Sequence, residues 1–307
     1  MALFSIVVAL LLEQLKPFAQ ERFLVQPLER YARLLENHFN DGQAGHGALA
    51  WVAGVLAPAL AVFIVLSVLN AFEQPEWVLV VNIAVLYATM GFRQSSHFFN
   101  DIHMALRLGE LDRARALCRQ WLGMAATEQL SSNEVARLAI EKALLDSHRH
   151  DFGPLCCFVV LGPAGAVIYR LAVFFSVRWG GADETAGFGT AAVRAFVLID
   201  WLPQRLSASA FAVVGDFEDA IYCWRTQAAR WPDITSGIVL ASGAGALGVR
   251  LGAPIHDAGG LRERPELGLG DAADADFMRS TIGLVWRSLV LCLLLLALFW
   301  VAGWLGR

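Results

Sequence analysis

Long apolar runs alternate with charged segments along this chain of 307 residues. A helix needs about 20 apolar residues to cross the hydrocarbon core of a bilayer. Three uncharged runs approach that length, at residues 48–70, 77–92 and 288–304. The pattern therefore predicts three transmembrane helices.

A fourth apolar stretch, at residues 153–177, is interrupted by Gly162, Pro163 and Gly165 and carries one charge, Arg170. These interruptions predict either one kinked span or a re-entrant hairpin. Broken backbone at membrane depth is tolerated only where protein or a water-filled cavity surrounds it. The stretch is therefore a candidate wall of a pocket.

Lys and Arg are distributed unevenly around the first two runs. Residues 13–47 and 93–152 are rich in these basic residues, whereas residues 71–76 carry two Glu and no basic residue. Basic segments favour the cytoplasmic side of a membrane. The first two runs therefore predict a hairpin with its tip outside, in a multi-pass protein of the bacterial inner (cytoplasmic) membrane. The apolar run at 1–12 predicts a retained membrane or interfacial segment.

Between the apolar runs, the spacing of hydrophobic residues indicates amphipathic helices. One is predicted over 105–122, and a second opens at the capping box Ser131-Ser132-Asn133-Glu134 and runs to about residue 145. Two more are predicted over 191–224, split near Gly215, and residues 261–276 are predicted to form a loop. Nothing in the pattern indicates a strand-rich domain.

The predicted fold class is all-α, a polytopic helical membrane protein with amphipathic cytoplasmic helices. A single domain is predicted over 1–307. Its parts are an N-terminal segment and cytoplasmic helix (1–47), a transmembrane hairpin (48–92), cytoplasmic helices (93–152), a core with a broken helix (153–260), and a loop with a C-terminal transmembrane helix (261–307).

Composition supports a lipid bilayer as the main partner. Hydrophobic residues make up 57% of the chain and charged residues 17%, whereas soluble domains are about 25% charged. The formal net charge of −4 does not suggest a basic surface, so nucleic acid is not an expected partner. The five cysteines lack the spacing of metal ligands or of a secreted disulfide framework.

Two short motifs match a nucleotide-binding or metal-binding pattern only in part. Residues 243–248 match the dinucleotide pattern G-x-G-x-x-G, but no strand is predicted before them, and small residues at this spacing also let membrane helices approach closely. In the run at 146–151, His148 and His150 alternate without the i, i+4 spacing of helical metal-ligand pairs. No metal site is predicted.

Arg170 is the strongest functional marker, because a charge inside an apolar stretch is costly unless it is paired. We expect it to pair with a carboxylate, Asp200 first. A polar pocket is predicted around this residue, although no catalytic residue is assigned. Its candidate residues are Arg93, Glu141, Asp146, His148, Asp151, Arg170 and Asp200.

Several segments resemble, in order, those of one known family. They lie at residues 106–115, 135–141, 161–165, 201–206, 245–252, 264–265 and 281–286. Between about residues 90 and 290 the chain is similar to the CobD/CbiB family of membrane-bound adenosylcobinamide-phosphate synthases and to its relative AmpE. The resemblance implies formation of an amide between an aminopropanol-type amine and the activated carboxyl of adenosylcobyric acid, late in cobalamin synthesis, with ATP and Mg²⁺.

Many polar positions of that family fall on apolar residues here, among them Ala125, Ala126, Phe174 and Phe175. An apolar side chain cannot bind Mg²⁺ or orient a phosphate. The expected function is therefore that of a catalytically degenerate, AmpE-like sensory or accessory protein; the alternative is a working synthase. No cofactor is predicted, with ATP and Mg²⁺ expected only for the synthase. The expected ligand is a corrinoid or another small molecule, and a second membrane protein is an expected partner.

Overall fold

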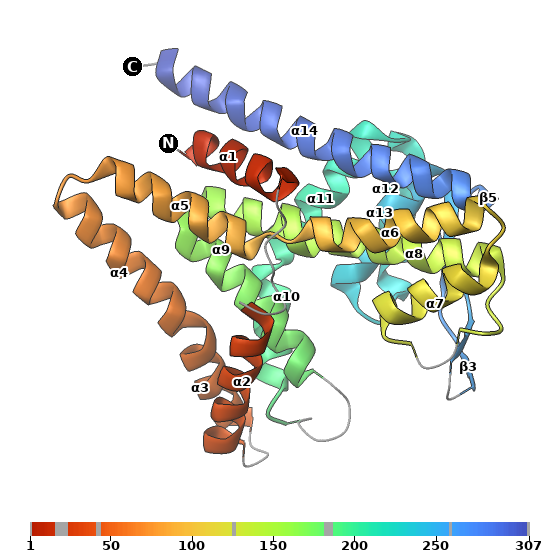
Figure 1. Ribbon diagram of the computed structural model, residues 1–307, viewed down its shortest axis with the longest axis horizontal. Helices are drawn as coiled ribbons and strands as arrows, with labels where there is room; N and C mark the ends of the chain where they lie inside the picture. Colours follow the sequence, from red (N-terminus) through yellow and green to blue (C-terminus); the bar gives the residue numbers. More distant parts are fainter. Residues whose placement is uncertain are drawn as a thin grey trace. The chain divides into compact units, whose positions relative to one another are not determined.

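The computed structural model describes residues 2–15, 24–40, 44–124, 127–180, 187–257 and 260–305. Figure 1 shows that these residues are mostly helical, and three helical runs have the length and apolar composition to cross a membrane, Gly45–Ala71, Ser132–Trp179 and Ala275–Gly303. The predicted class of helical membrane protein is confirmed. The chain forms two compact units. Unit 1 contains Met1–Gly91 and Arg149–Pro203, and unit 2 contains Phe92–His148 and Gln204–Arg307. The single domain predicted over 1–307 stays a prediction.

Unit 1 contains the N-terminal helices and both arms of the interrupted apolar stretch. Its elements are α1 (Ala2–Leu15), α2 (Gln26–Phe39), α3 (Ala44–Trp51), the π-helix η2 (Val52–Leu56), α4 (Ala57–Ala71), α5 (Pro75–Thr89), most of the π-helix η3 (His148–Phe152), α9 (Gly153–Trp179) and α10 (Thr190–Ile199).

The helix predicted for the first span is confirmed, because α3, η2 and α4 form one apolar helical run over Gly45–Ala71 that is long enough to cross a membrane. The second is the shorter apolar helix α5, which ends at Thr89 instead of residue 92. Figure 1 shows α4 and α5 joined by a tight turn. At 15 residues, α5 is about 22 Å long, less than the roughly 30 Å hydrocarbon core.

The C-terminal end of α9 lies in an aromatic core. Phe175 and Trp179 are buried there with Phe188, and the rings of Phe175 and Trp179 have centroids 4.3 Å apart. On α2, Glu36 accepts hydrogen bonds from the Trp179 indole at 2.8 Å and from Arg178 at 3.0 and 3.1 Å. These polar contacts and the aromatic core fix α2 against the end of α9.

The chain reverses direction at Gly162, inside α9. This residue has non-helical angles, φ 68° and ψ −162°. Arg170 lies 2.8 Å from His150 across the reversal, whereas 20 residues of continuous helix would separate their backbones by about 30 Å. Gly165 likewise packs against the backbone of Cys157. Of the two predicted alternatives, a kinked span and a hairpin, the structure contains the hairpin.

Unit 2 combines helices with a small sheet. Its helices are α6 (Phe92–Arg107), α7 (Leu111–Leu122), α8 (Ser132–Ser147), most of α11 (Trp201–Val214), α12 (Phe217–Gln227), the 3₁₀ helix η4 (Ala228–Arg230), α13 (Ile234–Leu247) and α14 (Ala275–Leu305). The helix predicted for the third span lies within α14, which already begins at Ala275 and is long and apolar enough to cross a membrane.

The helix boundaries in unit 2 agree only in part with those predicted from the spacing of hydrophobic residues. The capping box is confirmed: the Ser131 hydroxyl accepts from the Glu134 amide, and the Glu134 carboxylate accepts from the Ser131 amide at 2.8 Å. The single helix predicted over 105–122 is wrong, because Gly109 adopts φ +75° and separates α6 from α7. The segment 191–224 is divided at Gly215, as predicted, and also at Asp200.

Five short strands follow α13, where the sequence predicted only apolar and loop segments. They are β1 (Val249–Gly252), β2 (Ile255–Asp257), β3 (Gly260–Arg262), β4 (Glu266–Leu267) and β5 (Asp271–Ala272). The sheet order is β4-β1-β5, with β4 antiparallel and β5 parallel to β1, and β2 pairs with β3. Strands of two to four residues are too short to display an alternating pattern.

Candidate binding site

A buried ion pair joins α8 to the small sheet of unit 2. Glu141 lies inside α8, and its Oε2 accepts a hydrogen bond from Arg264 Nη1 at 2.7 Å. Its Oε1 accepts from Arg264 Nη2 at 3.3 Å and from the backbone amide of Gly252, at the end of β1, at 2.8 Å. A buried carboxylate is costly unless donors surround it. Glu141 therefore fixes β1 against α8.

Arg264 is held on several sides. Besides Glu141, its guanidinium donates to the carbonyl oxygens of Ala253 and Gly252, both at 3.2 Å. It also lies over the ring of Trp231, 5.4 Å from the ring centroid, a cation–π arrangement. These contacts leave Arg264 a structural residue.

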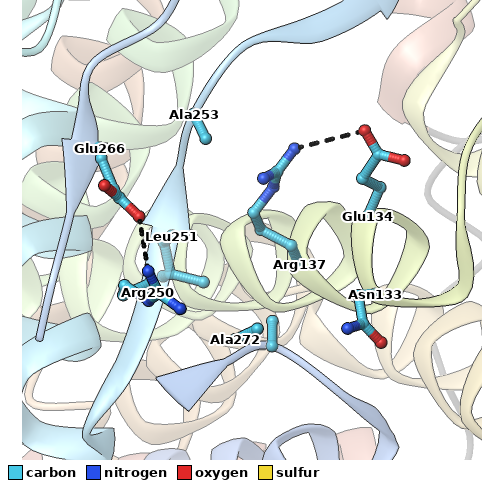
Figure 2. A pocket seen from close by; sticks show the side chains of 9 residues that line it. Asn133, Glu134, Arg137, Arg250, Leu251, Ala253, Glu266 and Ala272 are labelled. Atoms are coloured by element: carbon cyan, nitrogen blue, oxygen red, sulfur yellow. Dashed lines mark ion pairs between the residues drawn. The ribbon is translucent and has the colours of Figure 1, made fainter. Parts of the chain in front are cut away.

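The strands held in this way form one side of a cavity of about 230 Å³. Figure 2 shows Glu134 and Arg137 extending from α8, with Arg250 and Glu266 across from them. The remaining lining is small or apolar apart from one amide. It consists of Asn133, Leu251, Ala253, Ala272 and Ala273.

Arg137 is the most buried charged residue of the cavity, with 15% of its side chain exposed. Its Nη2 donates to the carbonyl oxygen of Pro254 at 3.3 Å and lies 4.0 Å from Glu134. Its Nε is buried and has no hydrogen-bond partner. Opposite, Arg250 lies 3.6 Å from Glu266, with about half of each side chain exposed. The cavity therefore presents two guanidinium groups, each with its paired carboxylate beyond the usual distance of a charge-assisted hydrogen bond.

Near Trp231, Asp233 caps the N-terminus of α13. Its carboxylate accepts from the Thr235 amide at 3.1 Å, the Ser236 amide at 3.2 Å, the Thr235 hydroxyl at 2.9 Å and the Ser236 hydroxyl at 2.5 Å. Burial alone raises the pKa of a carboxyl, but these hydrogen bonds outweigh it and lower the pKa of Asp233 below its usual 3.8. The charged form of Asp233 is therefore stabilised in the folded state.

Replacing Asp233 with alanine is expected to destabilise the protein by about 1 kcal/mol at neutral pH, the usual cost of losing an N-cap. Because folding lowers the pKa of Asp233, this contribution is complete above pH 3.8 and is lost as the pH falls below that value. The difference in melting temperature between the two proteins should be smaller at pH 3 than at pH 6. An equal difference at both values would contradict the assignment.

Three of the predicted pocket residues lie in unit 1. The side chain of Arg170 contacts His150, with Nη1 2.8 Å from Nδ1. Arginine can only donate, so His150 accepts through Nδ1 in this contact. Asp200 is buried and accepts from the Tyr169 hydroxyl at 2.8 Å. Asp151 is also buried. The expected pairing of Arg170 with Asp200 stays a prediction.

The other four lie in unit 2. Besides Glu141, Asp146 accepts from Lys142 at 2.6 Å on the same helix, and His148 Nδ1 lies 2.9 Å from the Ser207 hydroxyl. The side chain of Arg93 lies outside the described residues. Convergence of all these residues on one pocket stays a prediction.

Comparison with known proteins extends the family resemblance beyond residues 90–290, toward the N-terminus. The family model described as CobD/Cbib protein matches residues 6–285, nearly the whole chain. This chain belongs to the CobD/CbiB family. The match of this CobD/CbiB protein therefore also includes the N-terminal helices, which the sequence resemblance had left out.

Curated relatives of this CobD/CbiB protein are named "Cobalamin biosynthesis protein CobD". The one from Stutzerimonas stutzeri is 36% identical over 306 residues, 98% of each chain. The one from Chromobacterium violaceum is 36% identical over 212 residues, 69% of this chain and 68% of the relative. The one from Leptospira interrogans is 27% identical, with 80% of each chain covered. No solved structure matches significantly.

The residues that line the cavity of this CobD/CbiB protein were not predicted from the sequence. Arg137 and Arg250 do lie in family-like segments, at 135–141 and 245–252. Each follows apolar neighbours in a pattern that also fits an exposed surface arginine. The signal that distinguishes them is the burial of Arg137 and its position across from β1, which depends on tertiary structure.

Proposed function

We propose that this chain acts in cobalamin biosynthesis, in the step that joins an amine to the activated carboxyl of adenosylcobyric acid. The observation that carries the proposal is the end-to-end similarity to a relative named for cobalamin biosynthesis, at 36% identity over 98% of both chains. Similarity of this extent supports a shared role better than the degenerate accessory function expected from the apolar substitutions.

The cavity of unit 2 supports a binding role in that step. Amide formation from an activated carboxyl benefits from groups that hold anionic parts of the substrates and stabilise developing charge. Arg137 and Arg250 provide two guanidinium groups for this purpose. At about 230 Å³ the cavity is smaller than the roughly 300–1,000 Å³ of pockets for drug-sized ligands. It fits one small co-substrate and not a corrinoid ring.

ATP and Mg²⁺ are implied by the synthase proposal. Among the described residues, no group of three or more His, Cys, Asp or Glu side chains is placed to hold a metal ion. The described residues therefore do not form a resident metal site, and we assign no step to Mg²⁺.

An accessory role is the second candidate, and one observation favours it. By the sequence resemblance, Phe174 and Phe175 fall on polar positions of the family, and Phe175 is fully buried in the aromatic core of unit 1. A core position of this kind contributes packing and no acid–base chemistry. Such a protein would keep the family scaffold and bind a ligand without turnover.

Genetic complementation separates the two candidates. We expect the chain to restore cobalamin-dependent growth to a bacterium that lacks its own cobinamide-phosphate synthase. The variant Arg137→Gln should fail, whereas Arg113→Gln should succeed, because Arg113 is exposed and pairs only with Glu110 on the surface of unit 2. Absence of growth with the unchanged chain, at normal membrane expression, would contradict the synthase proposal and favour the accessory role.

We further propose that the protein is a multi-pass protein of the inner membrane, with the turn between α4 and α5 outside. A cysteine placed at Gln74, in that turn, should react with a membrane-impermeant maleimide added to intact spheroplasts. A cysteine placed at the exposed Arg113 should react only after lysis. Background from Cys118 and Cys223 should be low, because burial raises the pKa of these thiols to about 12 and about 11. Labelling at position 113 before lysis would reverse the orientation.

A further inference from the structure

The arginines of unit 2 differ in how completely their partners satisfy them. The Arg264 guanidinium donates to a carboxylate at 2.7 Å and to two carbonyl oxygens, and it is 11% exposed. The cavity arginines have longer ion pairs, 4.0 Å from Arg137 to Glu134 and 3.6 Å from Arg250 to Glu266. Distances of that length exceed those of charge-assisted hydrogen bonds. Of these three, Arg137 and Arg250 are the arginines with donors to offer a ligand.

Arg137 provides a second, independent indication of a bound ligand. Its Nε is buried without a hydrogen-bond partner, and an unsatisfied buried donor is costly. The neighbouring Nη2 reaches only the carbonyl oxygen of Pro254, at 3.3 Å. An oxygen from a bound molecule would satisfy the buried donor.

The shape of the cavity allows one group to reach both arginines. Figure 2 shows Arg137 and Arg250 on opposite sides, one from α8 and one from β1, with Ala272 near them and Ala253 beyond. Alanine side chains at these places leave space that a larger residue would fill. A planar guanidinium is suited to bind the paired oxygens of a phosphate or a carboxylate.

We propose that this cavity binds the oxyanion group, phosphate or carboxylate, of a small molecule between Arg137 and Arg250. Glu266 competes with that group for Arg250, since its carboxylate is the nearest acceptor, 3.6 Å away. Removing the negative charge of Glu266 should therefore strengthen binding, and removing the positive charge of Arg250 should weaken it. The proposal deepens the proposed function, on which it rests for the co-substrate role of the cavity, and contacts within unit 2 carry it.

The test is calorimetric titration of the full-length protein in a neutral detergent at low salt, with inorganic phosphate in one arm and acetate in the other. We expect saturable binding at one site in at least one arm. Loss of a charge-assisted hydrogen bond weakens binding by roughly tenfold, which we expect for Arg250→Gln. Glu266→Gln should bind more tightly. Arg113→Gln is the matched control, with an arginine of the same unit removed from an exposed pair.

Each outcome decides the proposal. Saturation by phosphate alone assigns a phosphate-bearing ligand, and saturation by acetate alone a carboxylate. Equal weakening by Arg250→Gln and Arg113→Gln would indicate only general attraction of anions and would overturn the proposal. Weaker binding by Glu266→Gln, or no saturable binding in either arm, would also overturn it. Arg250 is half exposed, so its substitution should leave the melting temperature unchanged. Failure of complementation would not affect this result.

Discussion

Replacement of Glu141 by alanine is expected to be among the most destabilising single changes in this protein. The side chains of Glu141 and Arg264 are 7% and 11% exposed, and removal of one partner from a buried ion pair typically costs about 3–5 kcal/mol because the other charge is left uncompensated. The substitution also removes the acceptor of the Gly252 amide. A large fall in melting temperature in detergent, followed by circular dichroism, is the expected measurement.

Glu110 provides the matched control. It forms an ion pair with Arg113 at 2.9 Å, but both side chains are largely exposed, and such pairs contribute about 0–1 kcal/mol. The melting temperature of Glu110→Ala should stay close to that of the unchanged protein. If Glu141→Ala melted at the same temperature as Glu110→Ala, the ion pair with Arg264 would not hold β1 against α8.

Replacement of Gly165 by alanine should disrupt the hairpin of unit 1. A Cβ at this position would collide with the carbonyl oxygen of Cys157 and would lie 2.7 Å from the Leu161 Cβ. Over-packing typically lowers the free energy of unfolding by about 1–3 kcal/mol. Because the Cys157 carbonyl oxygen belongs to the backbone and cannot move aside easily, we expect a loss near the upper end of this range. The expected results are a lower melting temperature and faster proteolysis in detergent.

Gly45 is the control for this change. It lies in the exposed part of α3, in the same unit, and a Cβ there would meet no atom within 4 Å. Alanine is a better helix former than glycine, so Gly45→Ala should be neutral or slightly stabilising. Equal stability of Gly165→Ala and Gly45→Ala would show that the two arms of the hairpin are not in contact.

The sequence predicts the parts of this fold that depend on local patterns. The apolar runs that become Gly45–Ala71 and the C-terminal part of α14 are long enough to identify by length alone. The capping box at Ser131 and Glu134 is a signal within four residues, and it marks the start of α8 correctly. In each case the side chains that determine the structure are neighbours in the chain.

The parts that the sequence does not predict depend on distant partners. Glu141 was a candidate pocket residue, but its partner Arg264 is 123 residues away. No local pattern identifies that pairing or the structural role it gives Glu141. The short strands around β1 are likewise stabilised by contacts with one another and with α8.

The interrupted apolar stretch is an intermediate case. Gly162 and Pro163 show that a regular helix cannot continue, but they fit a bend and a reversal equally well. The contact of Gly165 with Cys157, eight residues earlier, decides for the reversal. That contact depends on small residues on both arms, and the sequence shows their presence without showing that they meet.

The reversal at Gly162 has a consequence for membrane insertion. A segment that turns back on itself contributes an even number of crossings, whatever its depth in the bilayer, so it leaves the sidedness of all later segments unchanged. His150 and Arg170 meet at 2.8 Å across the two arms, so insertion of the hairpin into a bilayer would carry both side chains in together. We expect the two arms to insert as one paired unit, because either arm alone would expose one of these polar side chains without its partner.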